Sequence, residues 1–559
     1  MKNDYNEKKK KLLEIKQKID NMIETDGVNS ELIKLERKLD LAFNECIKSC
    51  NKEQDKNFIF SNYYSCKAMI ILSKGGDYLA LIECLKGFKR LITYVKKIST
   101  PQNWLKNFRY YKSRLKIITD KHLEIFGNAK SQQVNTILQH FKDIINLGVS
   151  LPEEIKKEIF EIILEVIENI VLDSGEIYTE EHLNRKERII DLLNKISIED
   201  FSIKGSIFQI EFILNKKHLF YYLRKIIPRQ GRKETTLNEK VEKIKNLVNE
   251  LKKLAGKEKN AFNKTDDEYK KFLAKVDTLT ASYYENLWVN KKIIDAIKIL
   301  EEIFKEIRKN IQLIHSPSFF LYFINEYSFV INFIKLLLVR KDYESFSTKA
   351  KMNWQKGLAQ NVKRQLDMAI AFFKFPVDDI QSRELLIIEK SASGKFMEFI
   401  IFYLLKEIAF KILKDVNLKN KVLSQKEEIN EILKLIKECT NPENDIQLNK
   451  YQNGTDIDIL IKSKYAFFIK TGIISGSDKT KIKNEFKVAI SAQYNPYFIL
   501  DIGKNFSIVK SIQEEFRDSV KIIDVGEFFE EIYRISQDLG ISIVLSRSVI
   551  KSFAGFTGG

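Results

Sequence analysis

The sequence predicts a mostly α-helical protein, in which an irregular all-helical N-terminal region precedes a C-terminal α/β domain with a mixed sheet. Two observations predict this fold class. Up to about residue 380, apolar residues recur every three or four positions, as Leu12, Ile15, Ile19 and Met22 do, which is the period of an amphipathic helix. After residue 381, short apolar runs of strand length alternate with helical segments, an order typical of α/β domains.

Several segments of the N-terminal part repeat the helical pattern. They cover residues 154–172, 240–256 and 290–311. Residues 61–92 have the pattern of a helix pair that turns at Gly75 and Gly76. Because no fixed repeat length follows, we predict an irregular array of helices.

The length and the local polarity predict the domain organisation. At roughly 100–200 residues per domain, 559 residues are enough for two to four domains. Residues 241–275 are unusually polar and predict a projecting helical hairpin or coiled-coil arm. We therefore predict a helical region at 1–235, a second helical region with a polar hairpin at 236–380, and the α/β domain at 381–559.

The chain is basic, with 94 Lys and Arg against 76 Asp and Glu and a formal net charge of +18. Residues 1–380 carry 68 basic and 52 acidic residues, whereas residues 381–559 carry 26 and 24. Excess positive charge attracts polyanions, of which nucleic acids are the commonest. A composition rich in Lys, Ile and Asn, typical of an AT-rich genome, gives the same excess without any such function. The charge alone leaves both explanations open.

The densest basic cluster lies in a predicted loop around Pro228 and Gly231. It consists of Arg224, Lys225, Arg229, Arg232 and Lys233. Such a loop suits contact with phosphate groups, although a merely solvated loop has the same composition. We take these five residues as candidate nucleic-acid-binding residues, with DNA favoured over RNA as the partner.

Several classes of protein have no support in the sequence. No apolar run reaches the ~18 residues that a membrane-spanning helix needs, and the charged N-terminus lacks the apolar stretch of a secretory signal. We therefore expect a cytoplasmic protein without a membrane partner. Cys46 and Cys50, four positions apart, form at most half a zinc site, and buried thiols are the simpler interpretation. The sequence has no P-loop and no GxSxG motif.

The C-terminal segment has a definite order of predicted elements. Helices at 394–413 and 426–439 precede strands at 456–461 and 465–470, a helix at 478–493, strands at 497–503 and 520–525, a helix at 527–540 and a run at 541–546. Only three residues separate the first two strands, which is typical of a β-hairpin. The alternation of helices and strands predicts a mixed sheet.

Three of these elements carry charged residues in apolar surroundings. Glu398 lies early in the predicted helix 394–413. Asp456 and Asp458 alternate with isoleucines, so both should face one side of their strand. Lys470 ends the next strand after three apolar residues.

These features resemble the PD-(D/E)xK family of restriction-endonuclease-like nucleases. The resemblance covers about residues 381–538 and rests on the element order and on the motifs G-K-F-M-E (394–398), G-T-D-I-D-I-L-I (454–461) and F-F-I-K-T-G (467–472). It implies that Asp458 is the metal-binding aspartate, Lys470 the catalytic lysine and Glu398 the helix glutamate. Asp456 matches an acidic position that some members carry.

The resemblance implies hydrolysis of phosphodiester bonds in nucleic acid, in restriction or in defence against mobile elements, with Mg²⁺ or Mn²⁺ as cofactor. Such an ion polarises the phosphoryl oxygen and activates a water molecule, and Mg²⁺ takes one or two carboxylates. An adjacent lysine can orient the water and offset negative charge in the transition state.

One position departs from the family pattern. The second carboxylate should lie two residues before the lysine, where this sequence has Phe468. Either that carboxylate has moved to the following helix, where Glu485 lies, or the domain is a catalytically inactive pseudonuclease. In the second case it is a scaffold or adaptor subunit, and the helical region binds partner subunits. The candidate catalytic residues are Asp458, Lys470, Glu398 and Glu485, and the candidate metal ligands are Asp458, Asp456 and Glu485.

Each of these residues also has a purely structural interpretation. A glutamate such as Glu398 is favoured in the first turn of a helix by the helix dipole. Asp456 and Asp458 follow an Asn-Gly pair, and aspartate is common at turns. Lys470 can simply pair with either aspartate. The joint order of the residues, rather than any one of them, favours the nuclease interpretation.

Overall fold

The computed structural model describes most of the chain. The described residues are 2–26, 30–98, 105–119, 123, 125–126, 130–173, 177, 179–225, 235–310, 334, 337, 382–414, 418–419, 422–424, 426–452, 455–470, 474, 476–503, 505–539 and 541. Contacts divide the chain into two compact units, an N-terminal unit of Met1–Ile226 with Arg232–Ala281 and a C-terminal unit of Ile227–Gly231 with Ser282–Gly559.

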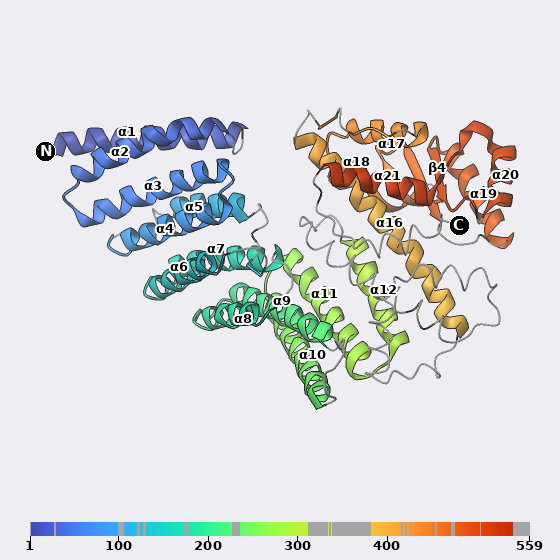
Figure 1. The fold of residues 1–559 in the computed structure, drawn as a ribbon, viewed down its shortest axis with the longest axis horizontal. Helices are drawn as coiled ribbons and strands as arrows, with labels where there is room; N and C mark the ends of the chain where they lie inside the picture. Colours follow the sequence, from blue (N-terminus) through green and yellow to red (C-terminus); the bar gives the residue numbers. More distant parts are fainter. Residues whose placement is uncertain are drawn as a thin grey trace. The chain divides into compact units, whose positions relative to one another are not determined.

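The N-terminal unit is an array of helices (Figure 1). They are α1 (Lys2–Asp26), the 3₁₀ turn η1 (Ser30–Leu35), α2 (Glu36–Lys48), α3 (Glu53–Ser73), α4 (Asp77–Val95), α5 (Leu105–Thr119), α6 (Ser131–Val149), α7 (Glu153–Asp173), α8 (Glu180–Leu193), α9 (Phe201–Lys225), α10 (Thr235–Phe262) and α11 (Glu268–Tyr284).

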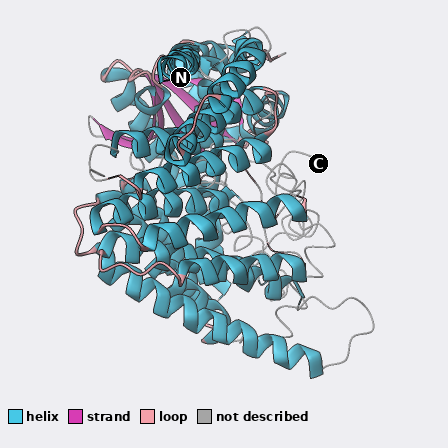
Figure 2. Cartoon of the chain, turned by 90° about the vertical axis from the view of Figure 1, so that its left-hand side faces the viewer, coloured by secondary structure: helices cyan, strands magenta, loops and turns pink. Residues whose placement is uncertain are grey.

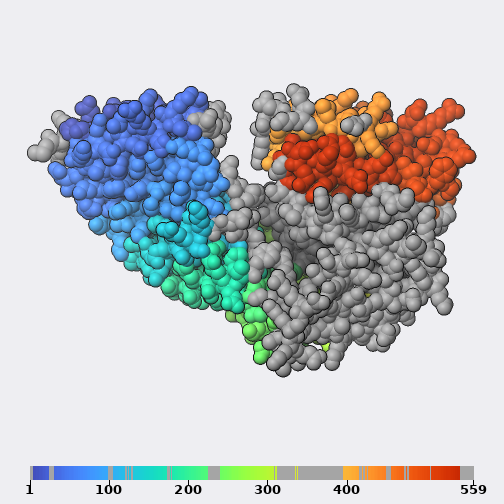
Figure 3. All heavy atoms as spheres, viewed as in Figure 1, coloured from blue at the N-terminus to red at the C-terminus, as the bar shows by residue number. Residues whose placement is uncertain are grey.

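Successive helices of this unit stack in layers (Figure 2), and their side chains close into a packed body in the space-filling view (Figure 3). One core of buried residues extends from Leu12 in α1 to Tyr221 in α9. Leu12, Ile15 and Ile19 are all buried, which confirms the amphipathic pattern of the first helix. Burial of such stripes, rather than helix propensity, supplies most of the stability of helices in proteins.

The helix pair predicted at residues 61–92 is α3 and α4. Gly75 has a φ of +78°, a conformation that residues with a Cβ rarely adopt. The Gly76 N–H donates to the Ile71 carbonyl and the Gly75 N–H donates to the Leu72 carbonyl, which is the Schellman pattern at a helix end. The Gly-Gly turn therefore ends α3 and reverses the chain into α4.

The polar segment 241–275 does not form a projecting arm. α10 packs along α9 and buries Ile244, Val248 and Leu251, which recur every three or four residues. At Gly205 of α9 the helices come so close that an added Cβ would lie 2.5 Å from the ring of Phe262. The predicted boundary at residue 235 thus falls between two helices that pack together, and the polar residues of α10 form the solvent side of an amphipathic helix.

The C-terminal unit combines helices with one sheet (Figure 1). Its helices are the π-helical turn η3 (Glu285–Val289), α12 (Ile293–Lys309), α16 (Ser382–Lys414), α17 (Glu427–Lys437), α18 (Pro442–Asp445), α19 (Gly476–Ser491), α20 (Phe506–Phe516), the 3₁₀ turn η6 (Arg517–Ser519) and α21 (Val525–Asp538). Its strands are β1 (Ile446–Gln452), β2 (Thr455–Ile461), β3 (Tyr465–Lys470), β4 (Asn495–Leu500) and β5 (Lys521–Asp524).

The strands form one mixed sheet in the order β1-β2-β3-β4-β5. β1, β2 and β3 pair antiparallel, whereas β3, β4 and β5 pair parallel across the helices α19 and α20. In the three-residue connection between β2 and β3, Lys462 and Ser463 both have a φ of 52°, the left-handed conformation that the two central residues of a type I′ turn adopt. The predicted fold class, mostly α with a C-terminal mixed sheet, is confirmed.

Two sets of helices cover the sheet. α19 and α20 share a core with the strands, in which Phe468 of β3 and Phe498 of β4 pack with Phe486 of α19 and Ile512 of α20. α16 contacts β1, β2 and β3, and α21, which also packs on α16, contacts β4 and β5. Parallel strands are normally covered in this way.

Apart from the short turns α18 and η6, two elements of the sheet domain have no counterpart in the sequence prediction. One is β1, in which Lys, Asn and Gln are interspersed among apolar residues. Among the described strands it pairs only with β2, and such edge strands are commonly polar. The other is α20, the crossover between β4 and β5. The run predicted at 541–546 lies outside the described residues apart from Ile541. None of the described helices has the length and apolar character that crossing a bilayer requires.

Candidate functional site

The centre of the candidate site is the end of the β2–β3 hairpin. The paired register of the two strands runs from Ile461 opposite Tyr465 to Ile459 opposite Phe467. Beyond these pairs, the Asp458 side chain bonds to the backbone of β3: its Oδ2 accepts a hydrogen bond of 2.6 Å from the Ile469 N–H. Asp458 is only 8% exposed, so this aspartate holds β3 in place as well as carrying charge.

Lys470 lies at the end of β3, beside Asp458. Its Nζ is 3.7 Å from Asp458 Oδ2, and its side chain is 37% exposed. Partial burial lowers the pKa of Lys470, but the negative charges of the surrounding carboxylates outweigh burial and raise it. Those carboxylates, in order of effect, are Asp458, Glu398, Glu485 and Asp456. The charges of all four acids predicted from the sequence therefore act on one amine, which lies beside Asp458.

Glu398 reaches this group from α16. The helix begins at Ser382, rather than beside Ser393 and Gly394 as predicted, because the residues before Gly394 continue the helix. Glu398 consequently lies about four turns from the helix start, where the dipole of the N-terminus no longer acts. It is almost completely buried, and its charge helps to raise the pKa of Lys470. The helix-start interpretation of this glutamate is therefore wrong.

Glu485 reaches the group from α19, the helix that follows β3. Burial raises the pKa of Glu485, and the negative charges of Asp458 and Asp456 add to this effect, while Lys470 and Lys481 lower the pKa. Lys481, one turn earlier on α19, lies 3.7 Å from Glu485 Oε1. The carboxylate predicted as the replacement ligand is thus close enough to Asp458 for the two charges to repel.

Phe468 occupies the place where the family pattern has a carboxylate. Its ring is buried and meets the ring of Phe486 edge-on, with centroids 5.2 Å apart. Phe486 directly follows Glu485 on α19, so the contact between the two rings fixes the helix against β3. The phenylalanine thereby belongs to the core that positions Glu485 beside Lys470.

Asp456 differs from Asp458 in its surroundings. It is exposed and lies opposite Tyr451 of β1, whereas Asp458 is buried. Its charge nevertheless affects the pKa of both Lys470 and Glu485, so it lies at the margin of the same group.

The donor set fits a hard divalent cation. Mg²⁺ prefers oxygen ligands and needs only one or two carboxylates, since it keeps several of its waters. Repulsion between Glu485 and Asp458 is the kind of strain that a cation relieves. Within the parts of the chain that the structure describes, no three His, Cys, Asp or Glu side chains gather closely enough to form a metal site. A bound Mg²⁺ would accordingly be held by Asp458 and Glu485.

The predicted basic loop is only partly within the described chain. Arg224 and Lys225 are the last residues of α9, and Arg229, Arg232 and Lys233 lie outside the described residues. Their role in nucleic-acid binding stays a prediction. Cys46 and Cys50 are both buried in the N-terminal unit.

Sequence reasoning did not single out two carboxylates at neighbouring strand ends. Asp501 follows β4, the strand beside Lys470, and is 3% exposed. Asp524 ends β5, where its side chain accepts from the N–H groups of Gly526 and Glu527 at the start of α21 and from that of Ile502. The signal was present in the sequence, because each aspartate directly follows an apolar run, and parallel strands end at one edge of a sheet.

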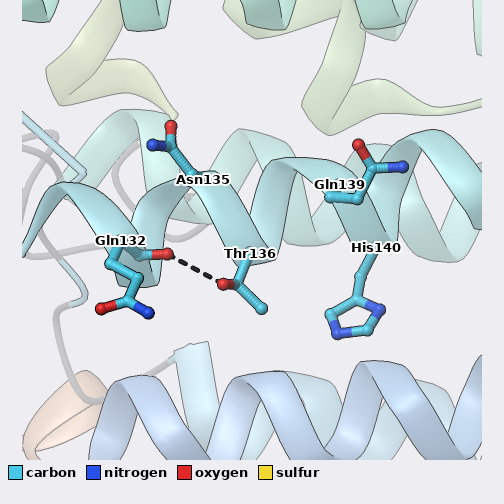
Figure 4. A pocket seen from close by; sticks show the side chains of 5 residues that line it. All are labelled: Gln132, Asn135, Thr136, Gln139 and His140. Atoms are coloured by element: carbon cyan, nitrogen blue, oxygen red, sulfur yellow. Dashed lines mark hydrogen bonds between the residues drawn. The ribbon is translucent and has the colours of Figure 1, made fainter.

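A separate hollow of about 450 Å³ lies in the N-terminal unit along α6 (Figure 4). Its lining side chains are Gln132, Asn135, Thr136, Gln139 and His140. The Thr136 hydroxyl donates to the Gln132 carbonyl at 2.8 Å, and burial, together with Lys89 and Lys86, lowers the pKa of His140. All five side chains come from one helix and contain no carboxylate, so the hollow contributes nothing to the candidate site.

No protein family model, no curated protein and no solved structure matches this chain. The resemblance to the PD-(D/E)xK nucleases therefore depends on the motifs at residues 394–472 and stays a prediction.

Proposed function

We propose that the C-terminal unit is a metal-dependent phosphodiesterase that acts on nucleic acid, with DNA as the favoured substrate. The observation that carries this proposal is the convergence of Glu398, Asp458 and Glu485, from a helix, a strand and a second helix, on Lys470. Scattered salt bridges would not bring together the four acids that the family motif and its displaced carboxylate single out.

In the proposed site each side chain has a distinct task. A bound Mg²⁺ or Mn²⁺ supplies Lewis-acid activation of the phosphoryl group and a water of lowered pKa. Asp458 and Glu485 hold the ion through carboxylate oxygens, and Asp456 adds negative charge at the exposed margin. Lys470, whose raised pKa keeps it charged at neutral pH, orients the attacking water and offsets charge on the phosphoryl oxygens. Glu398 positions the amine from the buried side.

The cellular context follows from the family resemblance alone. Restriction, or defence against mobile elements, in the cytoplasm is the setting in which nucleases of this kind act. In that setting the basic helical region supplies capture of the substrate, or binds a partner subunit.

The test is cleavage of labelled single- and double-stranded DNA and RNA by the full chain with Mg²⁺, with Mn²⁺ and with EDTA. We expect metal-dependent cleavage that Asp458→Asn abolishes. The control Glu514→Gln, at an exposed position of α20, should cleave like the unaltered chain. Absence of metal-dependent cleavage of all four substrates would refute the enzyme proposal.

One observation favours a second function, a non-catalytic scaffold or adaptor. The amine of Lys470 already pairs with Asp458, and Phe468 fills the usual carboxylate position with core packing. In such a protein the charge cluster stabilises the fold, and the domain serves assembly. Stable co-purification with a partner protein that high salt does not disrupt, together with no cleavage, would support this alternative.

A further inference from the structure

The charges of the N-terminal unit are unevenly distributed along its helices. Residues 53–119, which include α3, α4 and α5, contain 13 Lys and Arg but only 4 Asp and Glu. Residues 153–193, which include α7 and α8, contain 5 Lys and Arg but 12 Asp and Glu. Drift toward lysine in the whole chain would not produce this segregation. Residues 53–119 are therefore one of the parts of the chain in which the basic excess is concentrated.

α5 presents this charge on its solvent side. The helix contains no acidic residue. Lys106, Arg109 and Lys116 are all exposed, and their spacing of three and seven residues places them on one side of a helix. In the part of the chain that the structure describes, none of the three forms an ion pair.

The packing of α5 fixes the direction of this stripe, which we call the α5 stripe (Lys106, Arg109 and Lys116). Phe108, Tyr111 and Leu115 are buried on the opposite side of the helix. At the border of the stripe, Lys112 pairs with Glu165 of α7 at 2.9 Å. Glu165 of α7 is thus paired by Lys112 rather than by a residue of the stripe.

We propose that the α5 stripe binds the phosphate backbone of a nucleic acid. Ten residues of helix at 1.5 Å per residue span about 15 Å, which is the rise of about four nucleotides along one strand of a duplex at 3.4 Å. Cations that contact phosphates fix position without reading bases, so the stripe gives affinity independent of sequence. This inference rests on the proposed function, since it names the surface that holds the substrate.

The test is binding of a fluorescently labelled DNA duplex, and of an RNA duplex of the same sequence, to the full chain in EDTA at several salt concentrations. The variant K106Q/R109Q/K116Q removes three charges from the stripe. The matched control K245Q/K253Q/K259Q removes three from α10 of the same unit, where Lys245 and Lys253 already pair with glutamates. We expect the stripe variant to lower the log–log salt slope by about 2–3, at ~0.9 per phosphate contact, and the control to leave it unchanged.

Three results would overturn the proposal: an unchanged slope in the stripe variant, an equal loss in the α10 control, or binding of poly-glutamate as tightly as the duplex. Five of the six substituted residues are exposed and Lys245 is partly exposed, and the thermal unfolding temperature of each variant verifies that it folds. The outcome is separable from that of the proposed function. A chain that binds through the stripe but never cleaves would refute the phosphodiesterase and leave the binding surface in place, because Asp458 is not needed for binding.

Discussion

Asp458 has two tasks that substitution can separate, because its carboxylate both holds β3 and carries the charge expected of a metal ligand. Asp458→Ala leaves the buried Ile469 N–H without an acceptor, which costs about 1–3 kcal/mol. Loss of the partly exposed pair with Lys470 adds less than ~1 kcal/mol. Asp458→Asn keeps an oxygen that can accept from the Ile469 N–H, so it should lose about 1 kcal/mol or less.

We therefore expect the two variants to differ in stability, with Asp458→Ala the less stable, and to be equally inactive in cleavage. A loss of about 2 kcal/mol lowers the unfolding temperature of a unit of this size by about 4–8 °C. Calorimetry of the full chain should therefore rank Asp458→Ala well below Asp458→Asn, while neither variant cleaves nucleic acid. Hydrogen exchange of peptides that contain β3 should accelerate more in the alanine variant than in the asparagine variant.

Asp456→Ala is the matched control, since it removes a carboxylate two residues away on the same strand that is exposed to solvent. It should change the free energy of unfolding by no more than about 0.5 kcal/mol. Equal stability and equal hydrogen exchange in Asp458→Ala and Asp458→Asn would refute the structural task of the aspartate. Full cleavage by Asp458→Asn would refute its task as ligand.

Three further outcomes follow from the burial of other groups. Glu485→Gln should abolish cleavage yet stabilise the metal-free chain at pH 7. Burial raises the pKa of Glu485, so the stability of the unaltered chain falls as the pH rises through that pKa, and the uncharged amide avoids this fall. A variant that is less stable at pH 7 than the unaltered chain would contradict this. Phe468→Asp should destabilise the C-terminal unit by about 3–5 kcal/mol without raising the cleavage rate, because the ring of Phe468 packs in the core. Faster cleavage would show that the position faces the metal. Burial raises the pKa of Glu258 in α10 and, with repulsion from Glu168, raises that of Asp277 in α11 to about 6. Glu258→Gln should therefore stabilise the chain at pH 8 and much less at pH 4 in thermal melts, whereas Glu239→Gln, at an exposed position of α10, should change stability little at either pH.

The sequence was sufficient for the elements whose pattern depends on local burial. The alternation in β2, the apolar run of β3 and the short connection between them predict the hairpin correctly. β1 was not predicted because its own residues are mostly polar and it forms a strand by pairing with β2. The polar α10 was misjudged for the opposite reason: its narrow apolar stripe is enough when a glycine, Gly205, lets the partner helix approach closely. Both errors arise where the tertiary partner, rather than the local sequence, decides the structure.

The candidate site was predictable in its membership but not in its geometry. Motif order identified Glu398, Asp458 and Lys470, and the gap at Phe468 pointed to Glu485. The hydrogen bond from Ile469 to Asp458 could not be foreseen, because it depends on where the paired register of β2 and β3 ends. The length of α16 could not be foreseen either. Because the helix begins at Ser382, Glu398 lies far from its start and is buried.

Phe468 and Glu485 are best understood together, because the ring that excludes one carboxylate is what supports the other. The edge-on contact of Phe468 with Phe486 anchors the part of α19 from which Glu485 extends, and the charge of Lys470 partly offsets the cost of burying that acid. A fold that had merely lost a catalytic residue would gain nothing from keeping a second acid buried at that cost, since burial of an ionised carboxylate without function is unfavourable. The raised pKa of Glu485 therefore weighs toward an exchange of position rather than a loss, and the stability of Glu485→Gln at neutral pH is the measurement on which that argument depends.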